Sequence, residues 1–197
     1  DNLCMSAGGC FNDMDMLTVG MYGKGNVGLG KVCTFEEYRQ QFALWCLFGV
    51  PLMMGGDVRS LSAECEALLK NPALLAIDQD EECRPPYLIH KGCITVTNPD
   101  PAPGEYPWKD IHDAAYTFIR HLSNNEFALA FFNFAEQDAK IDCLFSDMGL
   151  PYPSGVGLEL TDVFTGEKLG VKRDAYKADV AAHGCRLFRA RLAHCNG

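Results

Sequence analysis

Two aspartates, Asp13 and Asp15, stand two positions apart inside the segment GGCFNDMDMLTVG, which occupies residues 8–20. On a β-strand both side chains point to one face, with Cα atoms about 6.6–7 Å apart. Carboxyl pairs hydrolyse glycosidic bonds when they lie about 5–5.5 Å or 6.5–9.5 Å apart and flank the scissile bond. Neighbours on one strand approach from one side only, so the spacing permits a catalytic pair but the geometry disfavours it. The alternative is a structural carboxylate that accepts backbone N–H groups at the strand end.

Two glycine-rich segments follow the aspartates. Residues 23–28 read GKGNVG and match the GxGxxG pattern of dinucleotide-binding turns. That pattern needs a helix that begins at the glycines, whereas the next helix signal comes at Thr34, so we expect a plain loop. Residues 55–57, Gly-Gly-Asp, follow an apolar run. They mark either the site-bearing end of a barrel strand or a cap for the next segment.

The elements that must position these residues alternate over the first part of the chain. Loose alternation over residues 10–19 predicts a strand, and the apolar run 51–54 predicts a second strand buried on both faces. Helical signals cover residues 34–50 and 62–70. This order of strands and helices predicts parallel strands joined by right-handed crossovers.

The first helix has explicit start and stop signals. Thr34 followed by Glu37 predicts a capping box, and Pro51 predicts the end of the helix. An apolar stripe at helical spacing is expected to belong to the core, and it consists of Phe42, Trp45 and Phe48.

The pattern changes near residue 83, where short alternating runs replace helical periodicity. Strands at this spacing predict an antiparallel β-sandwich, so the domain boundary should fall between about residues 80 and 88. The acidic, proline-rich segment 99–113 is expected to be an exposed loop. The predicted strands cover residues 87–90, 93–98, 115–122, 127–134, 140–145, 158–164, 168–171, 178–182 and 185–192.

Composition excludes several classes of partner. The chain has 197 residues and a formal net charge of −9, which disfavours nucleic acid and anionic membrane surfaces because both require a basic face. No apolar run is long enough to span a membrane.

The five histidines form no HxH, HxxH or HExxH spacing and the ten cysteines form no CxxC, so we expect no metal site and no cofactor. The chain does not begin with Met, and we expect it to be a portion of a longer protein.

These motifs converge on one family. The segment GGCFNDMDMLTVG resembles the signature GG-W-NDPDML-VG of clan D α-galactosidases, glycoside hydrolase family 27. The segments TFEEYRQQFALWCLFGVPLMMGGDVRSLS and NPALLAIDQD are similar to family segments in the same order, so the resemblance covers residues 8–80. Three positions depart from the pattern. Cys10-Phe11 replaces tryptophan, Met14 replaces proline, and Gly55-Gly56 replaces larger residues of some relatives.

The resemblance implies a fold of α/β plus all-β class. Residues 1–82 would hold the last two βα units of a (β/α)8 TIM barrel, and residues 83–197 would form an antiparallel β-sandwich. It also implies a retaining glycosidase whose substrate is a sugar with terminal α-linked galactose. The family's nucleophile and acid/base aspartates lie in motifs that this sequence lacks, so no catalytic residue is assigned here and the chain alone should be inactive.

The resemblance assigns the family's second motif aspartate and the methionine after it to Asp15 and Met16. Asp15 would accept a hydrogen bond from a sugar hydroxyl, Met16 would pack near the ring, and Asp13 would support both. Three alternatives stay open. They are a different sugar (an α-N-acetylgalactosaminide or a β-L-arabinopyranoside), a non-catalytic carbohydrate-binding module with Tyr106, Trp108 and Tyr152 as a platform, and a module that only supports the barrel.

Association and compartment follow from two further expectations. Two parallel strands cannot close a barrel and leave unpaired edges, so we expect self-association or pairing with a missing N-terminal barrel segment. Ten cysteines in a chain with ample apolar residues favour free thiols in a reducing compartment. We therefore expect a cytoplasmic location, with a secreted or lysosomal location as the alternative that the family implies.

Overall fold

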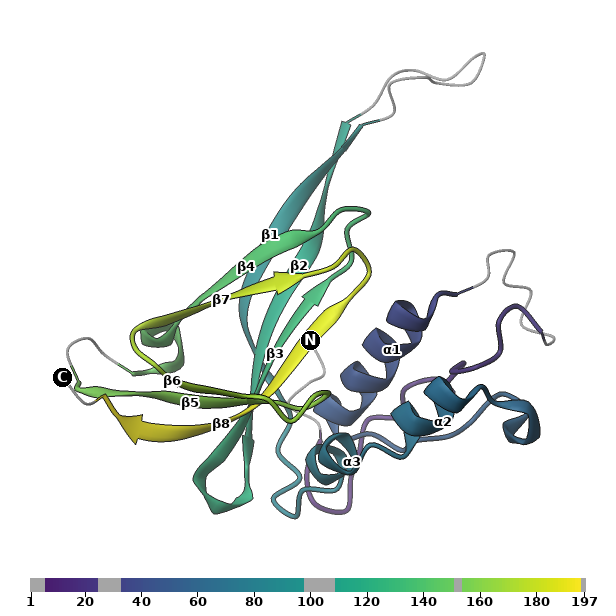
Figure 1. Cartoon of the computed structure of the whole chain (residues 1–197), viewed down its shortest axis with the longest axis horizontal. Coiled ribbons are helices and arrows are strands. Elements are labelled where there is room, and N and C mark those ends of the chain that lie inside the picture. The colour runs from purple at the N-terminus through teal and green to yellow at the C-terminus, as the bar shows by residue number, and fades with distance from the viewer. Residues whose placement is uncertain (1–5, 25–32, 98–108, 151–153, 196–197) are drawn as a thin grey trace.

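A six-stranded antiparallel sheet separates two packed layers in this protein (Figure 1). The computed structural model describes residues 6–24, 33–97, 109–150 and 154–195, with side chains omitted from the description over 93–97 and 109–113. Three helices cover one face of the sheet, and a two-stranded sheet packs against the other. The predicted class, a barrel end followed by an antiparallel sandwich, is confirmed.

The helices begin and end at the residues that their capping signals indicate. Helix α1 (Phe35–Phe48) starts at Thr34 with a complete capping box to Glu37 and ends at Gly49, which adopts the left-handed conformation with φ of 61°. The other helical elements also have side-chain caps. They are the short 3₁₀ turn η2 (Val58–Ser60) with Asp57, α2 (Ala63–Leu69) with Ser62, and α3 (Pro72–Asp78) with Asn71.

The two predicted barrel strands meet in parallel but are shorter than expected. Within the described residues their pairing is a single parallel bridge between Leu17 and Met54. The parallel direction matches the prediction, whereas the predicted extents 10–19 and 51–54 are wrong. A lone parallel pair has no neighbouring strands to extend its ladder, so only its centre keeps strand geometry.

The remaining strands form two antiparallel sheets, ordered β1-β2-β3-β8-β5-β6 and β4-β7. The two expected strands 87–90 and 93–98 are one strand, β1, interrupted by bulges. The expected loop 99–113 is wrong over 109–113, which belong to β2, and its remaining residues lie outside the description. The strands are β1 (Tyr87–Thr97), β2 (Lys109–Leu122), β3 (Glu126–Asn133), β4 (Ala139–Leu144), β5 (Val156–Asp162), β6 (Lys168–Lys172), β7 (Ala175–Val180) and β8 (Cys185–His194).

The large sheet has an apolar core on each face. On β3, Ala128, Ala130 and Phe132 belong to the core shared with the helices, while Leu129 and Phe131 belong to the core shared with β4 and β7. This alternation follows from the two-residue repeat of a strand. The barrel end and the sandwich are therefore joined through a common apolar layer. The proposed division between residues 82 and 83 falls in the segment that connects α3 to β1 and stays a prediction.

Buried polar contacts from the sheet reach the C-terminus of α1. Arg120 of β2 is 1% exposed, and its Nη1 donates to the carbonyls of Cys46 at 3.0 Å and Leu47 at 3.1 Å. A Cβ atom on Gly49 would lie 2.7 Å from Nη2 of the same guanidinium, so glycine provides both the left-handed turn and the space. A cation at this end of a helix also interacts favourably with the helix dipole.

Candidate functional site

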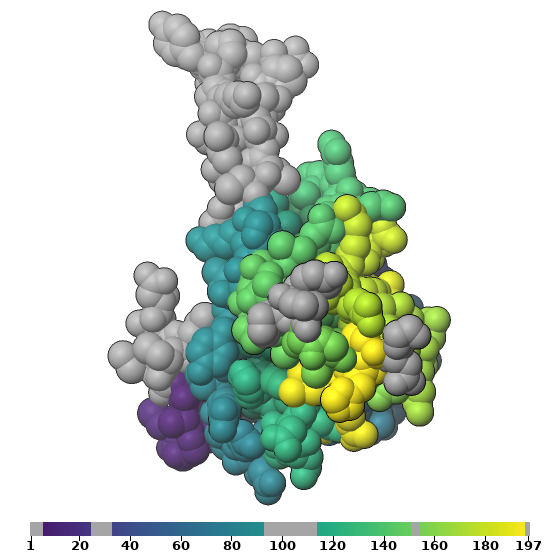
Figure 2. Space-filling view, turned by 90° about the vertical axis from the view of Figure 1, so that its left-hand side faces the viewer, coloured from purple at the N-terminus to yellow at the C-terminus, as the bar shows by residue number. Residues whose placement is uncertain are grey.

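The backbone of the NDMDM segment and of Leu17 after it is held by the parallel bridge and by a hydrogen bond from α1. At the parallel bridge, Leu17 N–H donates to the Met53 carbonyl at 2.7 Å, and Gly55 N–H donates to the Leu17 carbonyl at 2.9 Å. From α1, the indole Nε1 of Trp45 donates to the backbone carbonyl of Asp15 at 2.8 Å. Figure 2 shows that this N-terminal segment (purple) lies at the lower edge of the molecule, away from the residues of β8 (yellow).

The carboxylate of Asp15 is exposed, and its Oδ1 accepts the backbone N–H of Met16 at 2.7 Å. Asp15 thus accepts a backbone N–H group, as expected for a carboxylate with a structural role. An ionised carboxylate offers only acceptor sites, and an exposed one can accept a hydrogen bond from a ligand hydroxyl group. Asp13 is also exposed. The sugar-contacting role of Asp15 and the supporting role of Asp13 stay predictions.

Met16 rests against the glycine that follows the second strand. Its side chain is 42% exposed, and a Cβ on Gly55 would lie 2.2 Å from Met16 Sδ and 2.6 Å from Met16 Cγ. Because Gly55 has no side chain, the thioether can lie directly on the backbone of the neighbouring segment. The structure thus brings Met16 and Gly55 together from opposite ends of the crossover.

Replacing Gly55 with alanine is expected to displace Met16 toward solvent. The added methyl group overlaps the thioether, and a flexible, partly exposed methionine moves at a cost of about 1 kcal/mol or less. The NMR signal of the Met16 ε-methyl group should shift clearly in Gly55→Ala. It should stay in place in the matched control Gly8→Ala, where the added methyl has nothing within 4 Å. An unchanged Met16 signal in Gly55→Ala would contradict the described packing.

One residue of the predicted core stripe has a further role. Phe42 is buried as expected, and Trp45 and Phe48 pack partly buried against the same core. The predicted packing role of the stripe is thus confirmed. The apolar pattern did not predict the hydrogen bond from Trp45 to Asp15. The available signal was the indole N–H, which needs a partner when the ring is partly buried.

Of the two glycine-rich candidates, the segment that ends in Asp57 is fully described. Asp57 caps η2 by accepting Arg59 N–H at 3.0 Å and forms an ion pair with the Arg59 guanidinium, which lowers the pKa of this carboxyl. This is the capping role, one of the two alternatives considered for residues 55–57. Of the GxGxxG segment, only Gly23 and Lys24 lie within the described residues, so its nature as a loop stays a prediction.

The described residues carry neither a metal-binding cluster nor a membrane-spanning helix. Within the described ranges, no group of three or more histidine, cysteine, aspartate or glutamate side chains is arranged to hold a metal ion. None of the helices in that part of the chain combines the length and apolar character that crossing a bilayer requires.

A cavity of about 300 Å³ next to α3 is lined by Phe11, Pro51, Asp78 and Cys83 among others, and it does not include Asp13, Asp15 or Met16.

Two family descriptions match consecutive parts of the sequence. The family described as "Alpha galactosidase A" matches residues 1–80, and the "Alpha galactosidase C-terminal beta sandwich domain" matches residues 113–190. The first match contains the NDMDM segment and α1 to α3, and the second contains most of the large sheet. The two matches follow the order in which the barrel end and the sandwich occur in this fold.

Curated relatives and a solved structure agree with these matches. The chain is 28% identical to α-galactosidase mel1 of Schizosaccharomyces pombe over 91% of its own length and 36% of the relative. It is 31% identical to α-N-acetylgalactosaminidase of Rattus norvegicus over 83% of its length and 32% of that relative. The crystal structure of α-galactosidase I from Mortierella vinacea superposes with a TM-score of 0.70 at 25% identity, covering 94% of this chain and 41% of that one.

The chain thus spans about a third of the length of the curated relatives that it matches. The matched part includes both the end of the barrel and the β-sandwich, in the same order as in the relatives. The chain belongs to the α-galactosidase family, glycoside hydrolase family 27, and corresponds to the C-terminal portion of its members.

Proposed function

We propose that this chain is part of a retaining α-galactosidase that removes terminal α-linked galactose from oligosaccharides or glycoconjugates. The observation that carries the proposal is the exposed Asp15–Met16 pair, held by Trp45 and by Gly55 within a segment that matches the family. In this proposal Asp15 accepts a hydrogen bond from a galactose hydroxyl, Met16 packs near the ring, and Asp13 supports both.

The two catalytic carboxylates come from the upstream part of the complete enzyme. One attacks the anomeric carbon to form a glycosyl-enzyme intermediate, and the other protonates the leaving group and then activates water. The chain's own residues bind and orient the sugar. Asp15 can do so as an acceptor with a fixed backbone, which leaves little conformational freedom to lose on binding.

Two other activities fit the same architecture. An α-N-acetylgalactosaminidase is among the relatives reported above. A β-L-arabinopyranosidase is the other possibility of the same family. The residues that select among these sugars belong to the upstream part of the barrel in the proposed enzyme, so aryl glycosides of all three sugars belong in the assay.

A non-catalytic role is the candidate of a different class. A supporting module is favoured by the apolar core that the large sheet shares with α1 and α3. The aromatic platform of a carbohydrate-binding module would consist of Tyr106, Trp108 and Tyr152, which lie outside the described residues. Galactose binding by a form reduced to residues 83–197 would favour the binding module over the enzyme portion.

The proposed partners are an α-galactoside and either the upstream barrel or a second copy of this chain. Four exposed apolar side chains near the parallel bridge and the segments that flank it support such an association: Phe11, Met16, Met53 and Val58. The charge of −9 argues against nucleic acid and anionic membranes as partners. We propose a cytoplasmic location because the eight described cysteines are free thiols, with secretion or a lysosome as the alternative.

The isolated chain is expected to show no turnover of an aryl α-galactoside above the blank, since neither catalytic carboxylate is present. The complete reading frame should restore turnover. In that enzyme Asp15→Asn should lower kcat/KM roughly 10- to 100-fold, because a hydrogen bond to a charged acceptor contributes about 1.5–3 kcal/mol. The control Asp142→Asn, at a surface ion pair on β4, should leave kcat/KM unchanged. Turnover by the isolated chain that depends on Asp13 and Asp15 would overturn the proposal.

A further inference from the structure

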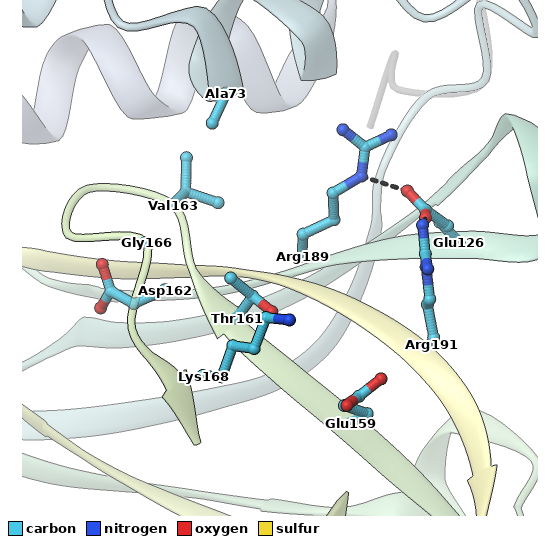
Figure 3. A pocket seen from close by; sticks show the side chains of 10 residues that line it. All are labelled: Ala73, Glu126, Glu159, Thr161, Asp162, Val163, Gly166, Lys168, Arg189 and Arg191. Carbon is cyan, nitrogen blue, oxygen red and sulfur yellow. Dashed lines mark hydrogen bonds and ion pairs between the residues drawn. The ribbon is translucent and has the colours of Figure 1, made fainter. Parts of the chain in front are cut away.

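A second cavity, distant in sequence from the NDMDM segment, opens on the helix-facing side of the large sheet. Its volume is about 350 Å³. Polar side chains from β3, β5, β6 and β8 line it, while Ala73 of α3 and Val163 supply apolar wall (Figure 3). This volume lies at the lower end of the range for small-ligand sites. The volume and the polar lining suit a compact polar ligand.

A buried carboxylate organises the cationic side of this cavity. Glu126 is 3% exposed and forms ion pairs with both Arg189 and Arg191 through its two oxygens. One carboxylate therefore holds two guanidinium groups, and the three side chains together carry an excess of one positive charge. Arg189 contacts Glu126 through Nε, and its two terminal nitrogens point away from the sheet, toward the side on which Ala73 lies (Figure 3).

The neighbouring strands add two more donors. The strand register pairs Thr161 with Arg189 across β5–β8 and with Lys168 across β5–β6. Within the described part of the chain, the Lys168 ammonium group makes no hydrogen bond or ion pair. Arg189, Thr161 and Lys168 therefore present a row of N–H and O–H donors along one wall.

The lining has three acidic and three basic side chains, but one of the acids is neutralised by a residue outside the lining. Asp162 is already engaged, since it pairs with Arg186 at 2.9 Å and accepts the backbone N–H of Phe164 and Thr165. Glu159 is exposed and offsets one further positive charge. Because Arg186, which does not line the cavity, neutralises Asp162, the remaining charged groups of the lining carry about one positive charge, in a protein whose overall charge is −9.

We propose that this cavity binds a compact oxyanion, a carboxylate, phosphate or sulfate group carried on a ligand about the size of one sugar ring. The two terminal nitrogens of Arg189, whose Nε is engaged by Glu126, donate to the oxyanion, and Lys168 and Thr161 donate to its remaining oxygens. Guanidinium groups match the planar geometry of such oxygens. A neutral sugar is disfavoured because no aromatic ring lines the cavity. The site is separate from the proposed galactoside site.

Titration calorimetry on the full chain tests this assignment, with inorganic phosphate, sulfate, galacturonate and galactose as probes. Phosphate, sulfate or galacturonate should bind with a Kd in the millimolar range, and higher salt should weaken the binding. Phosphate or sulfate binding without galacturonate identifies a free or esterified inorganic group as the ligand, and the reverse identifies an acidic sugar. Either pattern supports the site.

Lys168→Met is the decisive variant because its side chain is exposed and its loss leaves the Glu126 cluster intact. It should raise Kd about tenfold, as expected for a lost charge-assisted hydrogen bond. The matched control Lys140→Met, an exposed lysine on β4, should change Kd by less than about twofold. The proposal is overturned if none of the three anions binds, if galactose binds as tightly as the anions that bind, or if Lys168→Met binds these anions like the original chain.

Discussion

Replacing Arg120 with methionine is expected to destabilise the folded chain by about 3–5 kcal/mol, the cost of removing one member of a buried charge cluster. The variant keeps the apolar stem but leaves the Cys46 and Leu47 carbonyls without their donor at the C-terminus of α1. It also removes a positive charge that acts on Asp78 and Asp80. Urea unfolding followed by circular dichroism measures the change in the free energy of unfolding.

The pH dependence of the destabilisation distinguishes the loss of the Arg120 charge from the loss of its packing contacts. Burial raises the pKa of Asp78 to about 6, and Arg120 opposes that rise. A carboxyl whose pKa is higher in the folded state contributes stability below its unfolded pKa, and this contribution is lost as pH rises through the folded pKa. Without Arg120 the folded pKa of Asp78 rises further, so the destabilisation should grow between about pH 5 and pH 8.

Two comparisons make the Arg120 experiment specific. Arg59→Met removes a guanidinium from an exposed ion pair and should leave the urea concentration at the midpoint of unfolding nearly unchanged. Arg120→Lys keeps the charge but not the planar group of donors, so it should fall between the two. If Arg120→Met unfolded at the same urea concentration as Arg59→Met, the buried contact would not stabilise α1.

Removal of residues 1–82 is expected to abolish cooperative folding of the remaining sandwich. The helices cover the apolar face formed by Phe118, Leu122, Phe132 and Leu187. Exposing four such side chains costs about 1.5–3 kcal/mol each, and their sum approaches the whole stability of a typical domain. Light scattering should show the truncated chain as aggregates, and its urea transition should be broad or absent.

A rescue variant tests the cause. Phe118→Thr combined with Phe132→Thr in the truncated chain removes two large apolar groups while keeping good strand formers. Aggregation should fall markedly in this double variant. A truncated chain that stays monomeric and unfolds cooperatively without these substitutions would show that the sandwich is independent of the barrel end, and it would strengthen the reading as a separate module.

Local signals predicted most of the elements correctly. The capping box from Thr34 to Glu37, the end of α1 before Pro51, and the change to two-residue alternation near residue 83 all appear in the structure. Each of these signals depends on residues close together in the sequence, so it does not require contacts with distant parts of the chain. The wrong extents of the two barrel strands reflect the opposite case, because a parallel strand depends on neighbours that are distant in sequence.

The sequence by itself determined the family, the class of fold, and the segment that holds Asp13, Asp15 and Met16, because motif and periodicity are properties of consecutive residues. Only the tertiary structure decided which groups meet. Trp45 reaches Asp15, Arg120 reaches the end of α1, and Arg189 shares Glu126 with Arg191. These contacts join residues up to 74 positions apart or on different strands, and their partners are set by strand register and helix packing rather than by local spacing.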